Sequence, residues 1–318
     1  MSQTKVTLAH RAEAAAVWLL IQALRPLSPV TASRIGAAVA GCIGPFIPTS
    51  KIADKNLRLA MPELNLAQRR QIVKECWQNL GQTAAELVRI GEITEIPLGA
   101  PGPGYTVIGW DEHVGPALAA ATANKGPVIL FTGHLGNWEI LPAAAHAHGM
   151  NMGYMYRAAG NPLVDAMIMQ LRESNFKRKV LMFAKGAAGG RAAYAHLLKG
   201  GHLGLLVDQK LDTGLSIPFF GHDAMTMDAL ASFALKFRCP VIPTYVERIA
   251  PARLHVTCEA PLALPDSGDK QADMLALTTT MNQILERWIR HKPGAWLWLH
   301  RRWPKPLYRR TNDEAAVR

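Results

Sequence analysis

A histidine and a glutamate five residues apart are the pair in this sequence best suited to chemistry. They lie in the stretch FTGHLGNWE, residues 131–139. Residues five apart on one helix point in different directions, because neighbours on a helix face are three or four apart. With His134 in a turn and Glu139 in the first turn of a helix, however, the imidazole can fold back onto the carboxylate. The two would then form a general base that an acid holds in one tautomer.

No serine or cysteine adjoins this pair, so the base has no nucleophile of the protein's own to activate. The implied nucleophile is a hydroxyl group of the substrate. Two other interpretations stay open at this point. Glu139 can simply complement the N-terminus of a helix beside an ordinary histidine. Alternatively His134, Glu139 and the pair His146/His148 can hold a metal, although the H-E-x-x-H spacing of metal hydrolases is missing.

The flanking segments are typical of a strand and a helix that meet at this turn. Residues 126–131, GPVILF, are a short apolar run between turn formers, which indicates a buried parallel strand. Asn137 can cap a helix that carries Glu139 in its first turn and continues to His148. His134 is therefore expected in the turn between the two elements.

The rest of the chain after the linker at 97–104, PLGAPGPG, alternates strands and helices. Apolar runs predict strands at 105–108, 127–131, 152–156, 179–183, 203–207, 241–246 and 254–258. Helices are expected between them, from Asn161-Pro162 onwards, over 191–199 and over 228–238. This alternation predicts an α/β fold with a mostly parallel sheet covered by helices on both faces.

The segment before the linker is expected to be helical throughout. Residues 51–90 carry a charged helical pattern with a cap at Asn65. Two apolar stretches, 14–24 and 35–48, precede it, and neither reaches the ~20 predominantly apolar residues that a membrane span needs. We expect a helical hairpin that either lies on or dips into a bilayer, or packs on the main domain.

Four regions follow from these patterns. An apolar, membrane-associating hairpin covers 1–50, and a helical layer with the linker covers 51–104. The α/β domain covers 105–310, and a polar tail covers 311–318.

Polar side chains follow three of the predicted strands, and ligands of such sheets bind beyond the carboxyl ends of the strands. These residues are His134, Arg157 and Asp208-Gln209. We expect them to open onto one rim, unless they are structural ion pairs. The glycine-rich segment 185–191 offers backbone N–H groups to a phosphate, but it is not a P-loop because no Gly-Lys-Ser/Thr follows.

The composition narrows the class of partner. Lys and Arg number 35 against 24 Asp and Glu in 318 residues, so the net charge is +11. That charge favours nucleic acid, an acidic carrier protein or an anionic membrane. No basic helix or aromatic stacking motif of a known type is present, so nucleic acid is not expected. Four scattered cysteines suggest neither a zinc site nor a disulfide framework.

Five motifs, in order along the chain, resemble those of a known family. HLGNWE at 134–139 is similar to the His-x4-Asp/Glu motif of glycerolipid-type acyltransferases. The other four are similar to segments of the late acyltransferases of lipid A biosynthesis. They are Tyr156-Arg157 with Asn161-Pro162, Asp208-Gln209, PFFG at 218–221 with Ala224 and Thr226, and WLWLHRRW at 296–303. The resemblance runs from Leu57 to Trp303, although the Gly-Asn-Trp-Glu version also resembles mannoside acyltransferases of the same superfamily.

The resemblance implies a reaction, its partners and a place in the cell. A fatty acyl chain would pass from acyl carrier protein to a hydroxyl of a Kdo-lipid A precursor, an anionic glycolipid, at the cytoplasmic face of the inner membrane. No metal or other cofactor is required, and no nucleic acid takes part. Alternatives are a lysophospholipid or mannoside acceptor, or a lipid-binding protein without turnover.

The resemblance also assigns roles within the site. His134 would be the base and Glu139 its partner, with Arg157, Asp208 and Gln209 contacting substrate. Backbone N–H groups at Asn137, or Arg157, would stabilise the oxyanion. Alternatively Arg157 would bind a substrate phosphate.

A tryptophan-rich segment near the end of the chain allows two interpretations. Trp296, Trp298 and Trp303, beside Arg301 and Arg302, would form a belt at a membrane interface. Otherwise these rings pack in the core, which we favour for Trp296 and Trp298.

Overall fold

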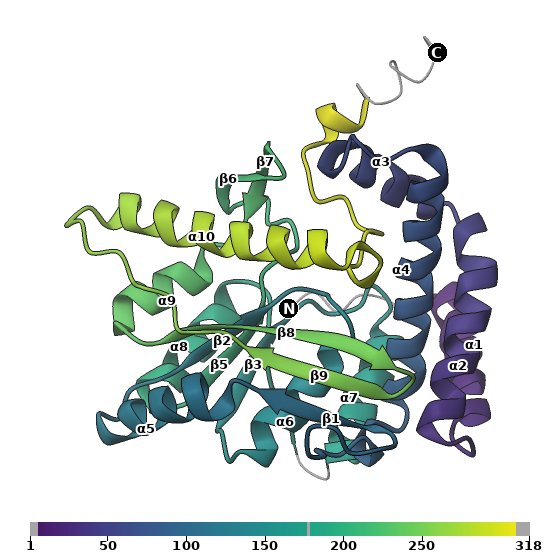
Figure 1. Cartoon of the computed structure of the whole chain (residues 1–318), viewed down its shortest axis with the longest axis horizontal. Coiled ribbons are helices and arrows are strands. Elements are labelled where there is room, and N and C mark those ends of the chain that lie inside the picture. Colours follow the sequence, from purple (N-terminus) through teal and green to yellow (C-terminus); the bar gives the residue numbers. More distant parts are fainter. Residues whose placement is uncertain (1–5, 177–178, 310–318) are drawn as a thin grey trace.

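The structure, a computed structural model, describes residues 6–176 and 179–309. Its centre is a seven-stranded sheet in the order β1-β9-β8-β2-β5-β3-β4 (Figure 1). The strands are β1 (Gly104–Ile108), β2 (Ile129–Thr132), β3 (Met152–Tyr156), β4 (Leu181–Ala184), β5 (His202–Leu206), β8 (Val241–Ala250) and β9 (Arg253–Cys258). Neighbouring strands are parallel, except that β8 and β9 are antiparallel. The predicted α/β fold with a mostly parallel sheet is confirmed, and each predicted strand overlaps an observed one.

Helices cover both faces of the sheet because alternate side chains of its strands point to opposite sides. On one face Ile129 and Phe131 join a buried cluster with α8, α9 and α10. On the other face Ile242 joins a cluster with α5 and α6, and α7 packs beside α6. These helices are α5 (Gly115–Ala123), α6 (Leu141–Ala147), α7 (Pro162–Phe176), α8 (Ala187–Leu198), α9 (Ala229–Phe237) and α10 (Lys270–His291).

A second, two-stranded sheet was not predicted from the sequence. It consists of β6 (Leu215–Phe219) and β7 (His222–Thr226), which are antiparallel. The two residues between them, Phe220 and Gly221, have φ of 50° and 73°. Positive φ at both positions is typical of a type I′ turn. The usual sequence signal for such a turn, Asn-Gly or Asp-Gly, is missing here, and Pro218 argues against a strand.

The N-terminal helices pack on the main domain at one side of the molecule (Figure 1), but not as the expected hairpin, because the first packs mainly on α7 and the second mainly on the fourth. They are α1 (Leu8–Leu24), α2 (Pro29–Ile43), α3 (Ser50–Ala60) and α4 (Leu66–Leu87). Gly36 of α2 and Gly81 of α4 approach so closely that a Cβ on either would collide with the backbone of the other. The predicted cap of α4 is present, since the Asn65 side chain accepts a hydrogen bond from the N–H of Gln68.

Several exposed side chains of α1, α2 and the turn after α2 are apolar. Among its exposed side chains are Trp18, Leu20, Val39, Ile43 and Phe46, and Phe46 is 87% exposed. Within the described residues, no helix alone has both the length and the apolar character to cross a bilayer. The segments 29–46 and 50–60 meet that criterion jointly, with a bend of 84° between them.

The tryptophan-rich segment lies in the core. Trp296 and Trp298 are completely buried, and Trp303 is 1% exposed. The Trp303 ring N–H donates to the carbonyl oxygen of Phe219 in the β6–β7 hairpin. The interpretation of these rings as a membrane belt is therefore wrong, and core packing is confirmed. The polar tail predicted at 311–318 lies outside the described residues.

Candidate active site

The turn after β2 is rigid, and it presents His134. Gly136 has a φ of 58°, and a Cβ there would collide with the carbonyl oxygen of Val246, so the turn requires glycine. The Gly136 carbonyl oxygen accepts hydrogen bonds from Asn79 (3.0 Å) and Thr83 (3.0 Å) of α4. The expected position of His134 between strand and helix is confirmed.

The acid that contacts the His134 ring is Asp208. In the parallel pairing of β2 with β5, Thr132 lies opposite Leu206, so the residues two positions on are neighbours. The Nδ1 atom of His134 lies 2.7 Å from Oδ1 of Asp208. The backbone N–H of His134 donates to Oδ2 of the same carboxylate at 2.8 Å. Strand pairing, rather than spacing along the chain, brings this acid to the base.

Asp208 is completely buried and ionised. Burial by itself would raise its pKa, but the charge and hydrogen bonds of His134 outweigh burial and hold the pKa of Asp208 well below its usual range. Its Oδ2 also accepts a hydrogen bond from the ring N–H of Trp296 at 2.7 Å. A carboxylate only accepts, so Nδ1 of His134 carries the proton, and Nε2 of the neutral ring is an acceptor. The Gln209 amide lies 3.3 Å from Nε2 and donates to it.

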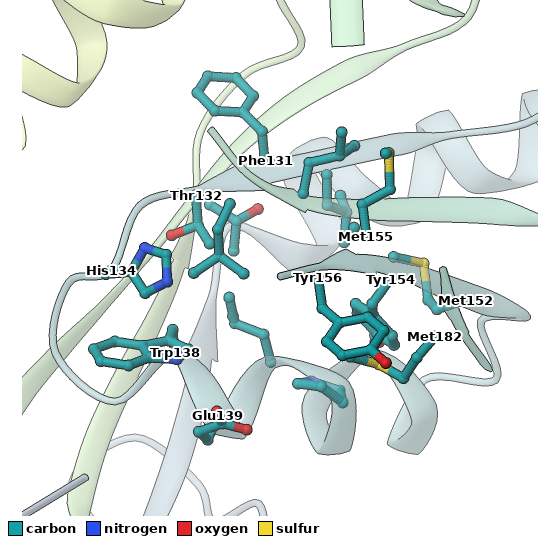
Figure 2. Close-up of a pocket in the computed structure, with 18 of the residues that line it drawn as sticks. Phe131, Thr132, His134, Trp138, Glu139, Met152, Tyr154, Met155, Tyr156 and Met182 are labelled. Atoms are coloured by element: carbon teal, nitrogen blue, oxygen red, sulfur yellow. The ribbon is translucent and has the colours of Figure 1, made fainter. Parts of the chain in front are cut away.

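Glu139 does not contact the His134 ring, and the prediction that it orients this ring is wrong. Both of its oxygens accept hydrogen bonds from Arg172 of α7, at 2.7 and 2.9 Å. Figure 2 shows the Glu139 carboxylate turned away from His134. The Asn137 cap places Glu139 at the start of the short helix before α6, and from there its side chain points toward α7. Arg172 gives it a bidentate partner that local sequence does not reveal.

A cavity of about 240 Å³ opens beside His134 and extends beneath the sheet. Its walls are apolar side chains of the strands and of α6, such as Leu130, Met152, Tyr154, Leu141 and Ala145 (Figure 2). The space therefore suits a long apolar group, and its polar end lies at the His134 turn.

An aromatic pair is also part of the cavity wall. Trp110 and His148 stack with ring centroids 3.7 Å apart, and Val107 and Cys258 lie beside them. His148 also pairs with Glu95 at 3.2 Å. Across the residues that the structure describes, no three His, Cys, Asp or Glu side chains group as metal ligands. The metal interpretation of His146 and His148 thus has no support here.

Two of the other predicted site residues line this cavity, and Asn137 does not. Arg157 and Gln209 lie at the polar end with His134. Asn137 is completely buried, and its amide donates to Glu86 of α4 at 2.7 Å. Its side chain therefore supports the turn, and the predicted role of the backbone N–H groups at Asn137 stays a prediction.

The support for Asn137 reaches the N-terminal helices. Glu86 is completely buried and pairs with Arg248 of β8. It also accepts a hydrogen bond from Ser33 of α2 at 2.6 Å. One buried carboxylate thus connects α2, the sheet and the turn that carries His134.

Several site residues could not be found from the sequence. Arg172 and Lys185 line the cavity, and Trp138 packs edge-on against the His134 ring, with centroids 5.0 Å apart. Trp138 stands inside the HLGNWE motif and Lys185 begins the glycine-rich segment 185–191, whereas Arg172 had no sequence signal. The segment 185–191 is not a loop, because α8 begins at Ala187.

The chain has an α/β fold, and His134 lies at the polar end of a cavity whose walls are mostly apolar. Residues 2–305 match the family of bacterial lipid A biosynthesis acyltransferases. The chain belongs to that family and is, in its general terms, an acyltransferase of lipid A biosynthesis. A comparison with curated proteins gives no match.

Proposed function

We propose that this acyltransferase moves a fatty acyl chain from the thioester of acyl carrier protein to a hydroxyl of a Kdo-lipid A precursor. The observation that carries the proposal is the His134–Asp208 pair at the polar end of an apolar cavity. An acyl chain that enters this cavity brings its thioester to the unprotonated Nε2 of His134. The family supplies the class of reaction, and the donor and acceptor are our inference.

His134 is the general base in the proposed step. The acceptor's hydroxyl oxygen attacks the thioester carbonyl carbon and forms the new C–O bond, while its proton passes to Nε2 of His134. The C–S bond then breaks, and the proton passes to the departing thiolate. Asp208 stays ionised and stabilises the imidazolium that forms between these events. General base catalysis of this kind contributes ~10²–10⁴ to the rate.

The Gln209 amide is the nearest side-chain donor to the reacting atoms. It lies 3.3 Å from Nε2 of His134 in the absence of substrate. When the hydroxyl takes its place on Nε2, the amide is free to donate to the oxyanion. One such donor is worth ~10²–10³ in rate. In this mechanism Glu139 fixes Arg172 and the wall of the cavity, and it transfers no proton.

We further propose that the reaction takes place at the cytoplasmic face of the inner membrane. The exposed side chains of Trp18, Leu20, Val39, Ile43 and Phe46 are an apolar surface of the kind that enters a bilayer interface. The net charge of +11 favours both an anionic glycolipid and an acidic carrier protein. Contact through α1 and α2 would hold the cavity next to the lipid acceptor.

The proposal is tested by identifying the lipid product. The full chain is incubated in neutral detergent with a Kdo-lipid A precursor and a mixture of acyl carrier thioesters, and the lipids are examined by mass spectrometry. We expect one acyl group per acceptor in ester linkage and a preference for one chain length. Parallel reactions with lysophospholipid and mannoside acceptors test the other acceptors. Folded protein that acylates only one of those, or nothing, would refute the proposal.

A further inference from the structure

Two cationic side chains lie side by side at the polar end of the cavity. β3 and β4 are parallel with Tyr156 opposite Ala184, so the residues that follow, Arg157 and Lys185, are neighbours. The backbone N–H of Lys185 donates to the carbonyl oxygen of Tyr156 at 2.8 Å, which extends the ladder to this point. Both side chains line the cavity. Paired strands lie ~4.8 Å apart, so the two cations emerge from adjacent points on the edge of the sheet.

These two charges are not neutralised within the protein. In the described part of the chain, neither side chain makes a hydrogen bond or an ion pair. Burial and the neighbouring charge of Arg157 lower the pKa of Lys185, and the exposed Asp212 only partly offsets this. Arg172, the third cation of the cavity, differs because Glu139 binds it through two hydrogen bonds. An anion placed between Arg157 and Lys185 would relieve their repulsion and accept charge-assisted hydrogen bonds from both.

The backbone beside Lys185 favours the same kind of ligand. α8 begins two residues later, and no side chain caps its N-terminus, where Gly186 has a φ of 125°. Free N–H groups at a helix start attract negative charge. A tetrahedral phosphate fits the two cations and this helix end together, because Arg157 can bind it through two parallel hydrogen bonds.

We propose that Arg157 and Lys185 bind a phosphate group of the lipid acceptor and so place its hydroxyl at His134. The inference rests on the proposed function. β3 and β4 are the second and third strands from β2 in the sheet, so the two cations emerge ~10 and ~14 Å from the end of β2. At these distances, one lipid molecule can place a phosphate between Arg157 and Lys185 and a hydroxyl at His134.

The position of α1 favours the lipid over the carrier protein as the source of the phosphate. The Asn161 amide, four residues after Arg157, donates to the carbonyl oxygen of His10 and to Glu13 of α1, both at 2.9 Å. The loop that carries Arg157 therefore lies against a helix with several exposed apolar side chains. An anionic lipid in the bilayer reaches this edge of the cavity directly.

The test compares binding of one lipid with and without its phosphate. The probes are a phosphorylated lipid A precursor and the same lipid after phosphatase treatment, each in neutral detergent, with binding followed by microscale thermophoresis. Wild-type protein should bind the phosphorylated lipid at least ~tenfold more tightly. Lys185→Gln and Arg157→Gln should each lose most of this preference. In turnover assays Lys185→Gln should raise KM for the acceptor while kcat and the KM for the donor change little.

Lys199→Gln is the matched control. It removes the same charge from the opposite end of α8, which is ~18 Å away, and it should keep the wild-type preference. Melting curves show whether each variant is folded. If Arg157→Gln is not folded, the test depends on Lys185→Gln alone.

Three results would overturn the inference. Wild-type protein that binds both lipids equally refutes it, as does an undiminished preference in Lys185→Gln. If Lys185→Gln raises KM only for the acyl carrier thioester, and not for an acyl pantetheine thioester that lacks phosphate, Arg157 and Lys185 bind the donor instead. Because binding needs no turnover, a phosphate preference without acyl transfer would refute the proposed function and still support a phosphate site at Arg157 and Lys185.

Discussion

Replacing Asp208 by asparagine should keep the His134 ring in place but change which of its nitrogens carries the proton. The buried carboxylate accepts three hydrogen bonds, from Nδ1 and the backbone N–H of His134 and from the ring N–H of Trp296. An asparagine keeps one oxygen. That oxygen can satisfy the two N–H groups that share Oδ2, so the amide NH₂ must then face Nδ1. Nδ1 becomes an acceptor, and the proton moves to Nε2.

The expected loss is large because the ring is then in the wrong tautomer. A protonated Nε2 cannot take the hydroxyl proton, and the charge that stabilises imidazolium is also gone. A comparable change in a Ser-His-Asp enzyme lowers kcat by ~10⁴ with the geometry intact, and we expect ~10³–10⁴ here. Stability should fall by only about 1–3 kcal/mol, the range for a buried hydrogen bond to a charged group.

The assay is acyl transfer under saturating donor and acceptor, with a melting curve for each protein. Asp273→Asn is the matched control, since Asp273 is also buried but its carboxylate binds Ser267 near the start of α10. It should keep the wild-type rate. The double variant Asp208→Asn/His134→Ala should be hardly slower than His134→Ala alone, because groups that act as one unit are not additive. A folded Asp208→Asn protein with kcat within tenfold of wild type would refute the assigned role.

Three further predictions concern stability and the membrane. Glu139→Ala leaves the half-buried charge of Arg172 unpaired and should lower the free energy of unfolding by about 2–3 kcal/mol. If a denaturant titration shows that the double variant Glu139→Ala/Arg172→Ala loses twice as much, the two side chains are not paired. Burial lowers the pKa of His300 to about 4, below ~6.5 in the unfolded chain, so the unfolded state binds more protons between these values. Stability should therefore fall by about 3 kcal/mol as the pH drops from ~6.5 to 4, and His300→Gln protein that shows the same fall would exclude this cause. Trp18→Ser and Phe46→Ser should each weaken binding to anionic vesicles by roughly tenfold, and unchanged co-flotation would show that this face does not enter the bilayer.

The elements of the fold could be predicted because their signals are local. Strands appeared as apolar runs, and the starts of α4 and α7 as the capping residues Asn65 and Asn161. The β6–β7 hairpin was missed because its turn, Phe220-Gly221, carries no usual turn signal. Local sequence patterns therefore predict which helices and strands form, but not which of them pack together.

The partner of the base could not be predicted, because partners are set by strand pairing. The sequence placed His134 and Asp208 on one rim, yet only the pairing of β2 with β5 makes them neighbours. Glu139 was closer along the chain and was wrongly chosen. Its actual partner, Arg172, is 33 residues away on α7. Proximity in sequence was a poor guide here, because a turn and a helix start separate the two side chains.

The central claim is that His134 is the base for acyl transfer, and one variant tests it most directly. His134→Ala protein, shown to be folded by its melting curve, is assayed with acyl carrier thioester and lipid acceptor, and the acylated lipid is quantified by mass spectrometry. Removing the ring costs the buried Asp208 carboxylate one hydrogen bond, so the free energy of unfolding should fall by about 1–3 kcal/mol while the protein stays folded. We expect the rate to fall by at least ~10³, since base catalysis and its orientation are lost together. A folded His134→Ala protein that acylates its acceptor at a near wild-type rate would contradict the mechanism.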